Sequence, residues 1–133
     1  MRVLSEKPPL GHLTTFGGHP VSCAAGFAAL RLMQEQGLPD RAKRMGTLLD
    51  ERLQGIVDQG LANQVWGRGL LFGLDVGRAD RAQRAMRSAF DAGLLLGDSL
   101  HAPQVLKLTP PLIVDEGAVD EATEILASVL GAL

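Results

Sequence analysis

The sequence predicts an α+β fold, in which three or four short strands form a small sheet and helices cover one face of it. Three observations lead to this prediction. Apolar residues recur at three- and four-residue steps in several segments, which is the period of an amphipathic helix. Apolar residues alternate over 70–76, which is the period of a half-buried strand. A long, almost wholly apolar segment precedes both patterns.

This apolar segment is expected to form a helix over residues 20–36. Pro20 suits the first helical turn, where its missing N–H has no intrahelical partner. From residue 21 to residue 33 only a serine and an arginine are polar, and many of the other side chains are small. A helix that is apolar on every side is normally buried. We therefore expect this helix, Cys23 included, to be covered by more protein than the rest of the chain supplies.

The other elements follow from the same two periods. In chain order we expect a helix over 39–57, two strands separated by a glycine break within 65–76, a helix over 79–92, short apolar strands at 93–98 and 104–109, and a final helix over 115–130. The helix over 79–92 is expected to bury Ala82, Ala85, Met86, Ala89 and Phe90. An arginine row on its other side, Arg78 to Arg87, is expected to lie in solvent, and an anion site is the alternative.

Composition excludes several classes of function. The 133 residues carry 13 basic and 15 acidic side chains, for a net charge of −2, and only five aromatic residues. Neither the charge nor the aromatic content indicates nucleic-acid binding. One cysteine permits no intrachain disulfide, and no segment is typical of a signal peptide or a membrane span, so we expect a cytoplasmic protein. His12, His19 and His101 are too scattered to indicate a metal site.

The segment "HLTTFGGHP", residues 12–20, is the candidate for chemistry. Threonine hydroxyls, two glycines that permit close backbone approach, and the start of a helix are the parts from which anion sites are built. Phosphate binding is therefore one interpretation. The alternative is a tight connection whose glycines only let the helix become buried.

Three stretches in order resemble the class III aminotransferases of the ornithine and acetylornithine type, which are pyridoxal-phosphate enzymes of fold type I. They are "TFGGHPVSCAAGFAAL", "GRGLLFGLDV" and "VLKLTPPLIVDEGAVDEATEIL". The resemblance covers nearly the whole chain from residue 9. It implies that 38–133 form the small C-terminal domain, with a mainly antiparallel sheet, and that 1–37 are the cofactor loop and interdomain helix left from the large domain.

The resemblance also implies roles for two residues. The family's threonine before the aromatic residue, here Thr15, donates a hydrogen bond to the cofactor phosphate of the neighbouring subunit. The family's arginine before the Pro-Pro pair binds the substrate α-carboxylate, and Lys107 stands at that position. A lysine supplies a point charge where the arginine supplied a bidentate fork. Trp66 stands where the family usually has another arginine.

The family's Schiff-base lysine lies in the large domain, and no lysine here has its glycine-rich context; Lys7 lies in "SEKPP". We therefore expect no catalytic residue in this chain. The resemblance implies the C-terminal part of an enzyme that moves an ω-amino group from an acetylornithine- or ornithine-like amino acid to 2-oxoglutarate. Its expected partners are a large domain or split subunit and a second copy of itself, as a homodimer or larger assembly. The alternative is a non-catalytic interaction or dimerisation module.

Overall fold

A computed structural model describes residues 14–133 of the chain. It divides into two compact units, Met1–Gln36 and Gly37–Leu133, which are described separately. The described part of the first unit consists of a turn at 15–18 and helix α2, Pro20–Glu35. Helix α2 begins at the predicted proline, and Gly37 follows its C-cap with a φ of 59°, a conformation that glycine adopts readily.

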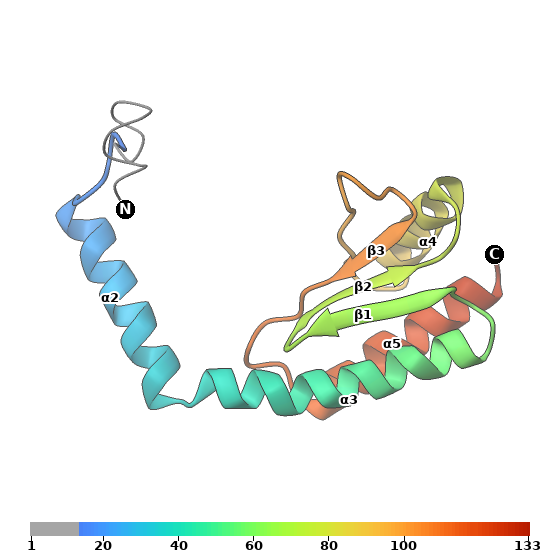
Figure 1. Cartoon of the computed structure of the whole chain (residues 1–133), viewed down its shortest axis with the longest axis horizontal. Coiled ribbons are helices and arrows are strands. Elements are labelled where there is room, and N and C mark those ends of the chain that lie inside the picture. Colours follow the sequence, from blue (N-terminus) through green and yellow to red (C-terminus); the bar gives the residue numbers. More distant parts are fainter. Residues whose placement is uncertain (1–13) are drawn as a thin grey trace, which may run out of the picture. The chain divides into compact units, whose positions relative to one another are not determined.

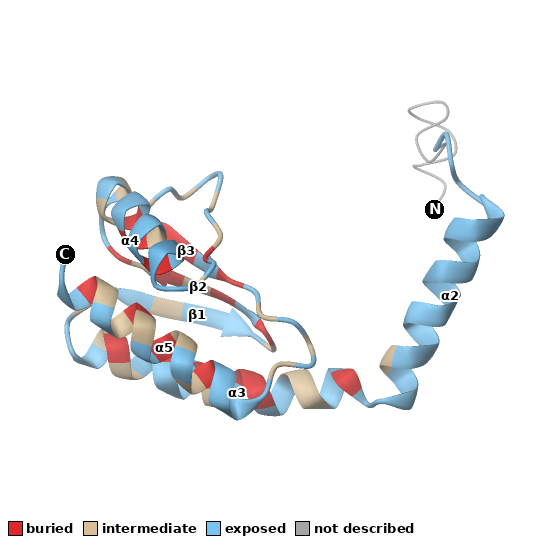
Figure 2. Ribbon diagram, turned by 180° about the vertical axis from the view of Figure 1, so that it is seen from behind, coloured by how far each residue is buried: buried red, intermediate tan, exposed pale blue. Residues whose placement is uncertain are grey.

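None of the residues of α2 is buried, and the helix is pale blue along almost its whole length in Figure 2. The side chain of Val21 is 71% exposed and that of Phe27 is 69% exposed. The prediction that Cys23 is a core residue is wrong for this chain, because the cysteine is exposed. The physical reason is that a turn and one helix supply nothing that could cover it.

The second unit is an α+β layer, as predicted. It contains α3 (Leu38–Asp58), β1 (Gln64–Arg68), β2 (Leu71–Asp75), α4 (Ala79–Asp91), β3 (Val105–Leu108) and α5 (Glu116–Gly131). The three strands form an antiparallel sheet in the order β1-β2-β3. All three helices cover one face of this sheet, with α3 and α5 side by side beneath it in Figure 1.

The expected strand at 93–98 is reduced to a single bridge at the edge of the sheet. Gly97 and Lys107 exchange two backbone hydrogen bonds, in which Gly97 N donates to Lys107 O (2.9 Å) and Lys107 N donates to Gly97 O (2.8 Å). The backbone of Lys107 is therefore held by β2 on one side and by Gly97 on the other.

Alternation along the strands separates a buried face from an open one. Phe72, Leu74 and Leu106 are buried against the helices, as the alternating pattern predicted for the first two. Their neighbours point the other way and form what we call the open face. In this face Trp66 pairs with Gly73, which in turn pairs with Lys107 across the sheet.

Helix α3 buries five apolar residues at helical spacing: Leu38, Met45, Leu49, Leu53 and Ile56. Helix α4 buries only three alanines, Ala82, Ala85 and Ala89. Met86 is half-buried. The prediction that Phe90 is buried is wrong, because its side chain is 67% exposed. Each helical residue turns by about 100°, so Phe90 lies to the side of the stripe that Ala89 ends.

Polar side chains fix the ends of the helices. Asp115 caps α5 by accepting a hydrogen bond from the N–H of Ala118 (2.8 Å). Arg81, predicted to lie in a solvated row, donates instead to the carbonyl oxygens of Val76 (3.4 Å) and Leu130 (3.1 Å). It therefore ties the end of β2 to the last turn of α5.

The backbone of helix α3 lies in close contact with the backbone of the turn between β1 and β2. A Cβ on Gly46 would lie 2.7 Å from the carbonyl carbon and 2.9 Å from the Cα of Gly69. Gly69 itself has a φ of 58°, in the left-handed region that favours glycine. Two glycines thus permit this contact: Gly46 leaves no room for a side chain without movement of the backbone, and Gly69 adopts a φ that side chains disfavour.

Candidate functional site

The turn at 15–18, which we call the Thr15 turn, is exposed. The N–H of Gly17 donates to the carbonyl oxygen of Thr14 (3.3 Å), and that of His19 donates to the carbonyl oxygen of Phe16 (3.1 Å). Gly18 has a φ of 80°. The Phe16 and His19 rings pack edge to face with centroids 6.4 Å apart. These contacts hold the turn directly before the first residue of α2.

The start of α2 has no side-chain cap. His19 occupies the N-cap position with a φ of −60° and a ψ of 125°, and its imidazole accepts no hydrogen bond from the helix. The first helical bond runs from the N–H of Cys23 to the carbonyl oxygen of His19 (2.9 Å). Uncapped first-turn amides and the positive end of the helix dipole favour an anion. A phosphate group fits this set of backbone donors.

Lys107, the second predicted site residue, lies in the open face of the second unit. Its neighbours there are fixed by close contacts. The Cε2 and Cζ2 atoms of Trp66 and the Cγ1 of Val105 each lie 3.1 Å from the point that a Cβ on Gly73 would occupy. The indole therefore extends across Gly73 toward β3. The Cε of Lys107 would lie 2.7 Å from a Cβ on Gly97, so the lysine stem runs along that glycine.

These side chains surround a cavity of about 330 Å³, which we call the open-face cavity. Its apolar lining includes Trp66, Leu71 and Val105. Its polar lining consists of Arg68, Ser99 and Lys107, and none of the described residues that line it is acidic. The cavity therefore combines an aromatic and aliphatic surface with positive charge.

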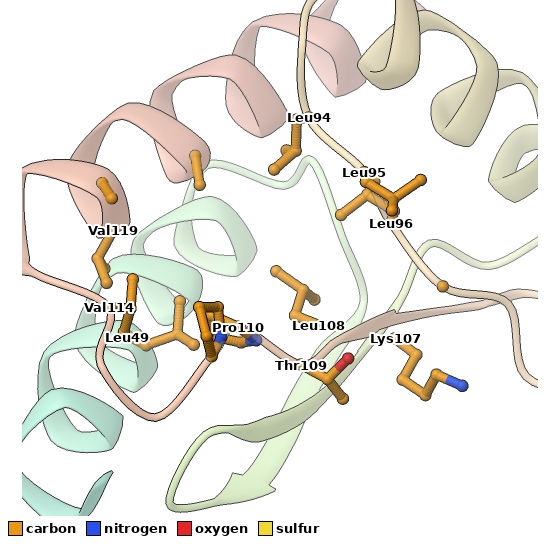
Figure 3. Close-up of a pocket in the computed structure, with 14 residues that line it drawn as sticks. Leu49, Leu94, Leu95, Leu96, Lys107, Leu108, Thr109, Pro110, Val114 and Val119 are labelled. Atoms are coloured by element: carbon orange, nitrogen blue, oxygen red, sulfur yellow. The ribbon is translucent and has the colours of Figure 1, made fainter. Parts of the chain in front are cut away.

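A larger cavity of about 560 Å³ lies between α3, α5, β3 and residues 94–97 (Figure 3). Its lining is mostly aliphatic, as Leu49, Leu108 and Val119 illustrate. Lys107 stands at its edge, but in Figure 3 the lysine side chain extends away from Leu49 and Val119. The larger cavity therefore offers little chemistry, although it is the more spacious of the two.

Arg78, Asp80 and Arg84 form a group of ion pairs on the surface of the fold. Arg78 donates to both carboxylate oxygens of Asp80 (2.9 and 3.3 Å), and Arg84 lies 3.8 Å from the same group. The hydrogen bond from Arg78 lowers the pKa of Asp80 below its ordinary value.

The prediction about a metal site concerns three histidines that are scattered along the sequence. His19 and His101 are exposed, and His12 falls outside the described residues. In residues 14–133, histidine, cysteine and carboxylate side chains do not gather in groups of three or more that could hold a metal ion. Over the same residues no helix is both long and apolar enough to cross a membrane.

Comparison with known proteins defines the class of this fold. The chain superposes on the crystal structure of acetylornithine aminotransferase from Elizabethkingia anophelis with a TM-score of 0.83 and 28% identity, over 92% of this chain and 32% of that one. The structural relatives are fold-type-I aminotransferases. The family model for class-III aminotransferases matches residues 1–130, so the chain belongs to this family.

Curated relatives agree with this assignment. The chain is 40% identical to acetylornithine aminotransferase of Mycobacterium leprae (strain TN) over 121 residues, which are 91% of this chain and 29% of that protein. It is 34% identical to ornithine aminotransferase of Exiguobacterium sp. over 128 residues, which are 96% of this chain and 31% of that protein. The chain thus spans about 30% of the length of these relatives, and it corresponds to their C-terminal portion. The family depends in general on pyridoxal phosphate.

Sequence reasoning named Thr15 and Lys107 but did not group Trp66, Gly73 and Lys107. The sequence did contain the signal that pairs Trp66 with Gly73. A two-residue turn at 69–70 between β1 and β2 places Trp66 opposite Gly73. No local signal specified which residue of β3 pairs with Gly73, because that register depends on the connection through α4.

Proposed function

We propose that the chain is the C-terminal part of a pyridoxal-phosphate-dependent aminotransferase of the acetylornithine or ornithine type. The complete enzyme moves an ω-amino group from an acetylornithine- or ornithine-like amino acid to 2-oxoglutarate. The observation that carries this proposal is the family match over residues 1–130, together with relatives named for both amino donors. When bound, pyridoxal phosphate supplies the electron sink for amino-group chemistry.

In this proposal the Thr15 turn holds the cofactor phosphate of a neighbouring subunit. The threonine hydroxyl donates a hydrogen bond to a phosphate oxygen, and such charge-assisted bonds are about twice as strong as neutral ones. The uncapped start of α2 adds backbone N–H donors and the positive end of a helix dipole. Gly18 adopts the positive φ that this turn requires.

Lys107 binds the substrate carboxylate in the same proposal. Its position in the open face, its exposed ammonium group and the absence of acidic side chains from the lining of the open-face cavity support this role. An ammonium group attracts a carboxylate as a point charge, whereas a guanidinium grips it with two parallel hydrogen bonds. The substrate is therefore held with less angular constraint than an arginine would impose.

The proposal assigns the Schiff-base lysine to a large domain, on the same polypeptide or on another one. The sequence contains three lysines, and none has the expected glycine-rich context. Lys43 is paired with Asp40 at 3.0 Å on the surface of α3. The exposed apolar surface of α2 suits coverage by that large domain and by a second subunit. This chain by itself is proposed to be inactive, and the cytoplasm is the proposed compartment.

A trapping experiment tests the missing lysine. The purified chain is mixed with pyridoxal phosphate, reduced with borohydride and digested for mass spectrometry. We expect no lysine to be modified selectively. Specific labelling of Lys7, Lys43 or Lys107 would contradict the assignment of the Schiff-base residue to another segment.

A complementation experiment tests the activity. The chain is co-expressed with the part of the Mycobacterium leprae acetylornithine aminotransferase that it does not match, and amino transfer from acetylornithine to 2-oxoglutarate is measured. The proposal expects activity in the complex and none with either piece alone. A stable complex without activity, in which pyridoxal phosphate still binds, would favour the alternative of an interaction or dimerisation module.

A further inference from the structure

We infer that the larger cavity, which lies between α3, α5, β3 and residues 94–97, binds an uncharged aliphatic small molecule. The cavity is formed wholly within the second unit, which begins at Gly37. The inference does not depend on the proposed function, because it uses neither the cofactor, nor the Thr15 turn, nor the charge of Lys107.

The wall of the larger cavity is aliphatic. Leu49, Leu108 and Val119 are buried core residues that form its inner part, as Figure 3 shows. None of the described residues that line the cavity is aromatic or acidic, and their only polar side chains, Thr109 and Lys107, are exposed. A charged group inside the cavity would lose its hydration without gaining a partner. The lining therefore favours a ligand without charge.

The volume of the cavity indicates an occupant. Protein interiors leave few voids larger than a water molecule, whereas a volume of about 560 Å³ is typical of sites for small molecules. An ordered water needs about two to four polar partners, which this wall does not supply. An aliphatic molecule would instead make the van der Waals contacts that Leu49, Leu108 and Val119 lack on the cavity side.

Hydrogen bonds hold the part of the wall that residues 109–114 form. Arg41 of α3 donates to the carbonyl oxygens of Ile113 (3.3 Å) and Val114 (2.7 Å). The N–H of Val114 in turn donates to the carbonyl oxygen of Pro111 (2.9 Å). This segment is therefore bound to α3 at one end and closed on itself by a turn.

The part of the wall that residues 94–97 form is held in a similar way. The N–H of Leu94 donates to the carbonyl oxygen of Ala89 (2.8 Å) in α4, and Gly97 exchanges two hydrogen bonds with Lys107. Both parts of the wall are thus in place before a ligand arrives. A preformed wall reduces the cost of ordering the protein on binding.

The exposed lining residues mark the mouth of the cavity. The side chain of Leu95 is 82% exposed, and Thr109 is exposed as well. A ligand with one terminal hydroxyl can leave that group at the mouth, in water, while its aliphatic part contacts the wall and covers Leu95. A linear primary alcohol has this form and serves as the probe.

The experiment is isothermal titration calorimetry of the full chain with 1-butanol, 1-hexanol and 1-octanol. Octanoate, octylammonium and 1,8-octanediol are compared with 1-octanol. We expect saturable binding of 1-octanol and an affinity that falls about fourfold for each methylene removed. The diol must place a hydroxyl against the aliphatic wall, and the two ions must place a charge near it, so each should bind about tenfold more weakly or less.

Variants of α5 separate the cavity from general apolar binding. Ala122 is half-buried and lines the cavity, so Ala122→Leu fills part of it and should weaken 1-octanol binding about tenfold or more. Ala127 is also half-buried but lies outside the lining, so Ala127→Leu is the matched control and should leave the affinity unchanged. Urea denaturation checks that each variant folds.

A second variant keeps the test decisive if Ala122→Leu does not fold. Ala118 lines the cavity and is exposed, so Ala118→Leu narrows the cavity without crowding the core. It too should weaken the binding of 1-octanol, by a larger factor than Ala127→Leu does.

Several results would overturn the inference. They are no saturable binding of 1-octanol, equal affinities along the alcohol series, tighter binding of octanoate than of 1-octanol, and equal effects of the cavity variants and Ala127→Leu. Light scattering with and without 1-octanol should give the same mass. An alcohol that dissociates a self-associated form would assign the cavity to a second copy of the chain instead. The titration involves no amino transfer, so its failure and that of the complementation experiment are separate results.

Discussion

The contact between Gly46 and Gly69 gives a prediction with a built-in control. In Gly46→Ala the new methyl group would meet the backbone of the β1–β2 turn at 2.7 and 2.9 Å, where no flexible side chain can move aside. Forced overpacking of this kind costs about 1–3 kcal/mol, and more where backbone must shift. Alanine restores about 1 kcal/mol of helix propensity, which partly offsets this steric cost.

Gly55 lies on the same helix, and nothing is within 4 Å of the position that its Cβ would take. Gly55→Ala is therefore expected to stabilise the fold by about 0.5–1 kcal/mol. Helix propensity is common to both variants, so it cancels when the two are compared. The difference between their free energies of unfolding is the steric term, about 1–3 kcal/mol, with Gly46→Ala the less stable.

The assay is urea denaturation of the two variants and the unmodified chain, followed by Trp66 fluorescence, which reports on the second unit. The urea midpoint of Gly46→Ala should lie below that of Gly55→Ala. The midpoint of the unmodified chain should lie between the two where the steric cost exceeds the gain in helix propensity. Two variants that differ by less than about 0.5 kcal/mol would refute the argument, because that is the scatter of ordinary surface substitutions.

Four further outcomes follow from the contacts described above. Asp115→Ala removes the cap of α5 and should cost about 1 kcal/mol in urea denaturation, while Asp115→Asn should keep most of the stability. Leu106→Ala empties a fully buried site and should cost about 2–5 kcal/mol in the same assay. The pKa of Asp80 is lower in the folded state than in the unfolded chain, so the contribution of Asp80 to stability is present at neutral pH and is lost as the pH falls through the folded pKa. The difference in unfolding free energy between the unmodified chain and Asp80→Asn should therefore shrink as the pH is lowered in acid titrations of unfolding. In the assembled enzyme, Thr15→Ala should weaken cofactor retention by about 1.5–3 kcal/mol, measured by equilibrium dialysis, and equal retention in Thr15→Ala and Thr14→Ala would count against the phosphate contact.

Much of the fold could be predicted from the sequence because its signals are local. Alternation placed Phe72 and Leu74 in the core, and Pro20 placed the start of α2. The errors arise where burial depends on neighbours. Phe90 lies beside a stripe of alanines and not on it, and Cys23 lies on a helix whose described unit offers nothing to cover it.

The candidate site was predicted only in part. The resemblance to a known family drew attention to Thr15 and Lys107, whose roles stay predictions. The row of Trp66, Gly73 and Lys107 depends on two strand registers, and the second of these crosses a helical connection. Periodicity specifies which face a residue takes but not which residue of a distant strand lies beside it. The open-face cavity therefore became visible only in three dimensions.

The two hydrogen bonds between Gly97 and Lys107 have a consequence for how such a domain can diversify. They secure the backbone of residue 107 independently of its side chain, and the glycine leaves room for a long stem beside it. An exchange between lysine and arginine there would replace a point charge by a planar fork of donors, or the reverse, while the strand beneath stays in place. The geometry of the charge at this position can therefore change while the two backbone hydrogen bonds with Gly97 persist.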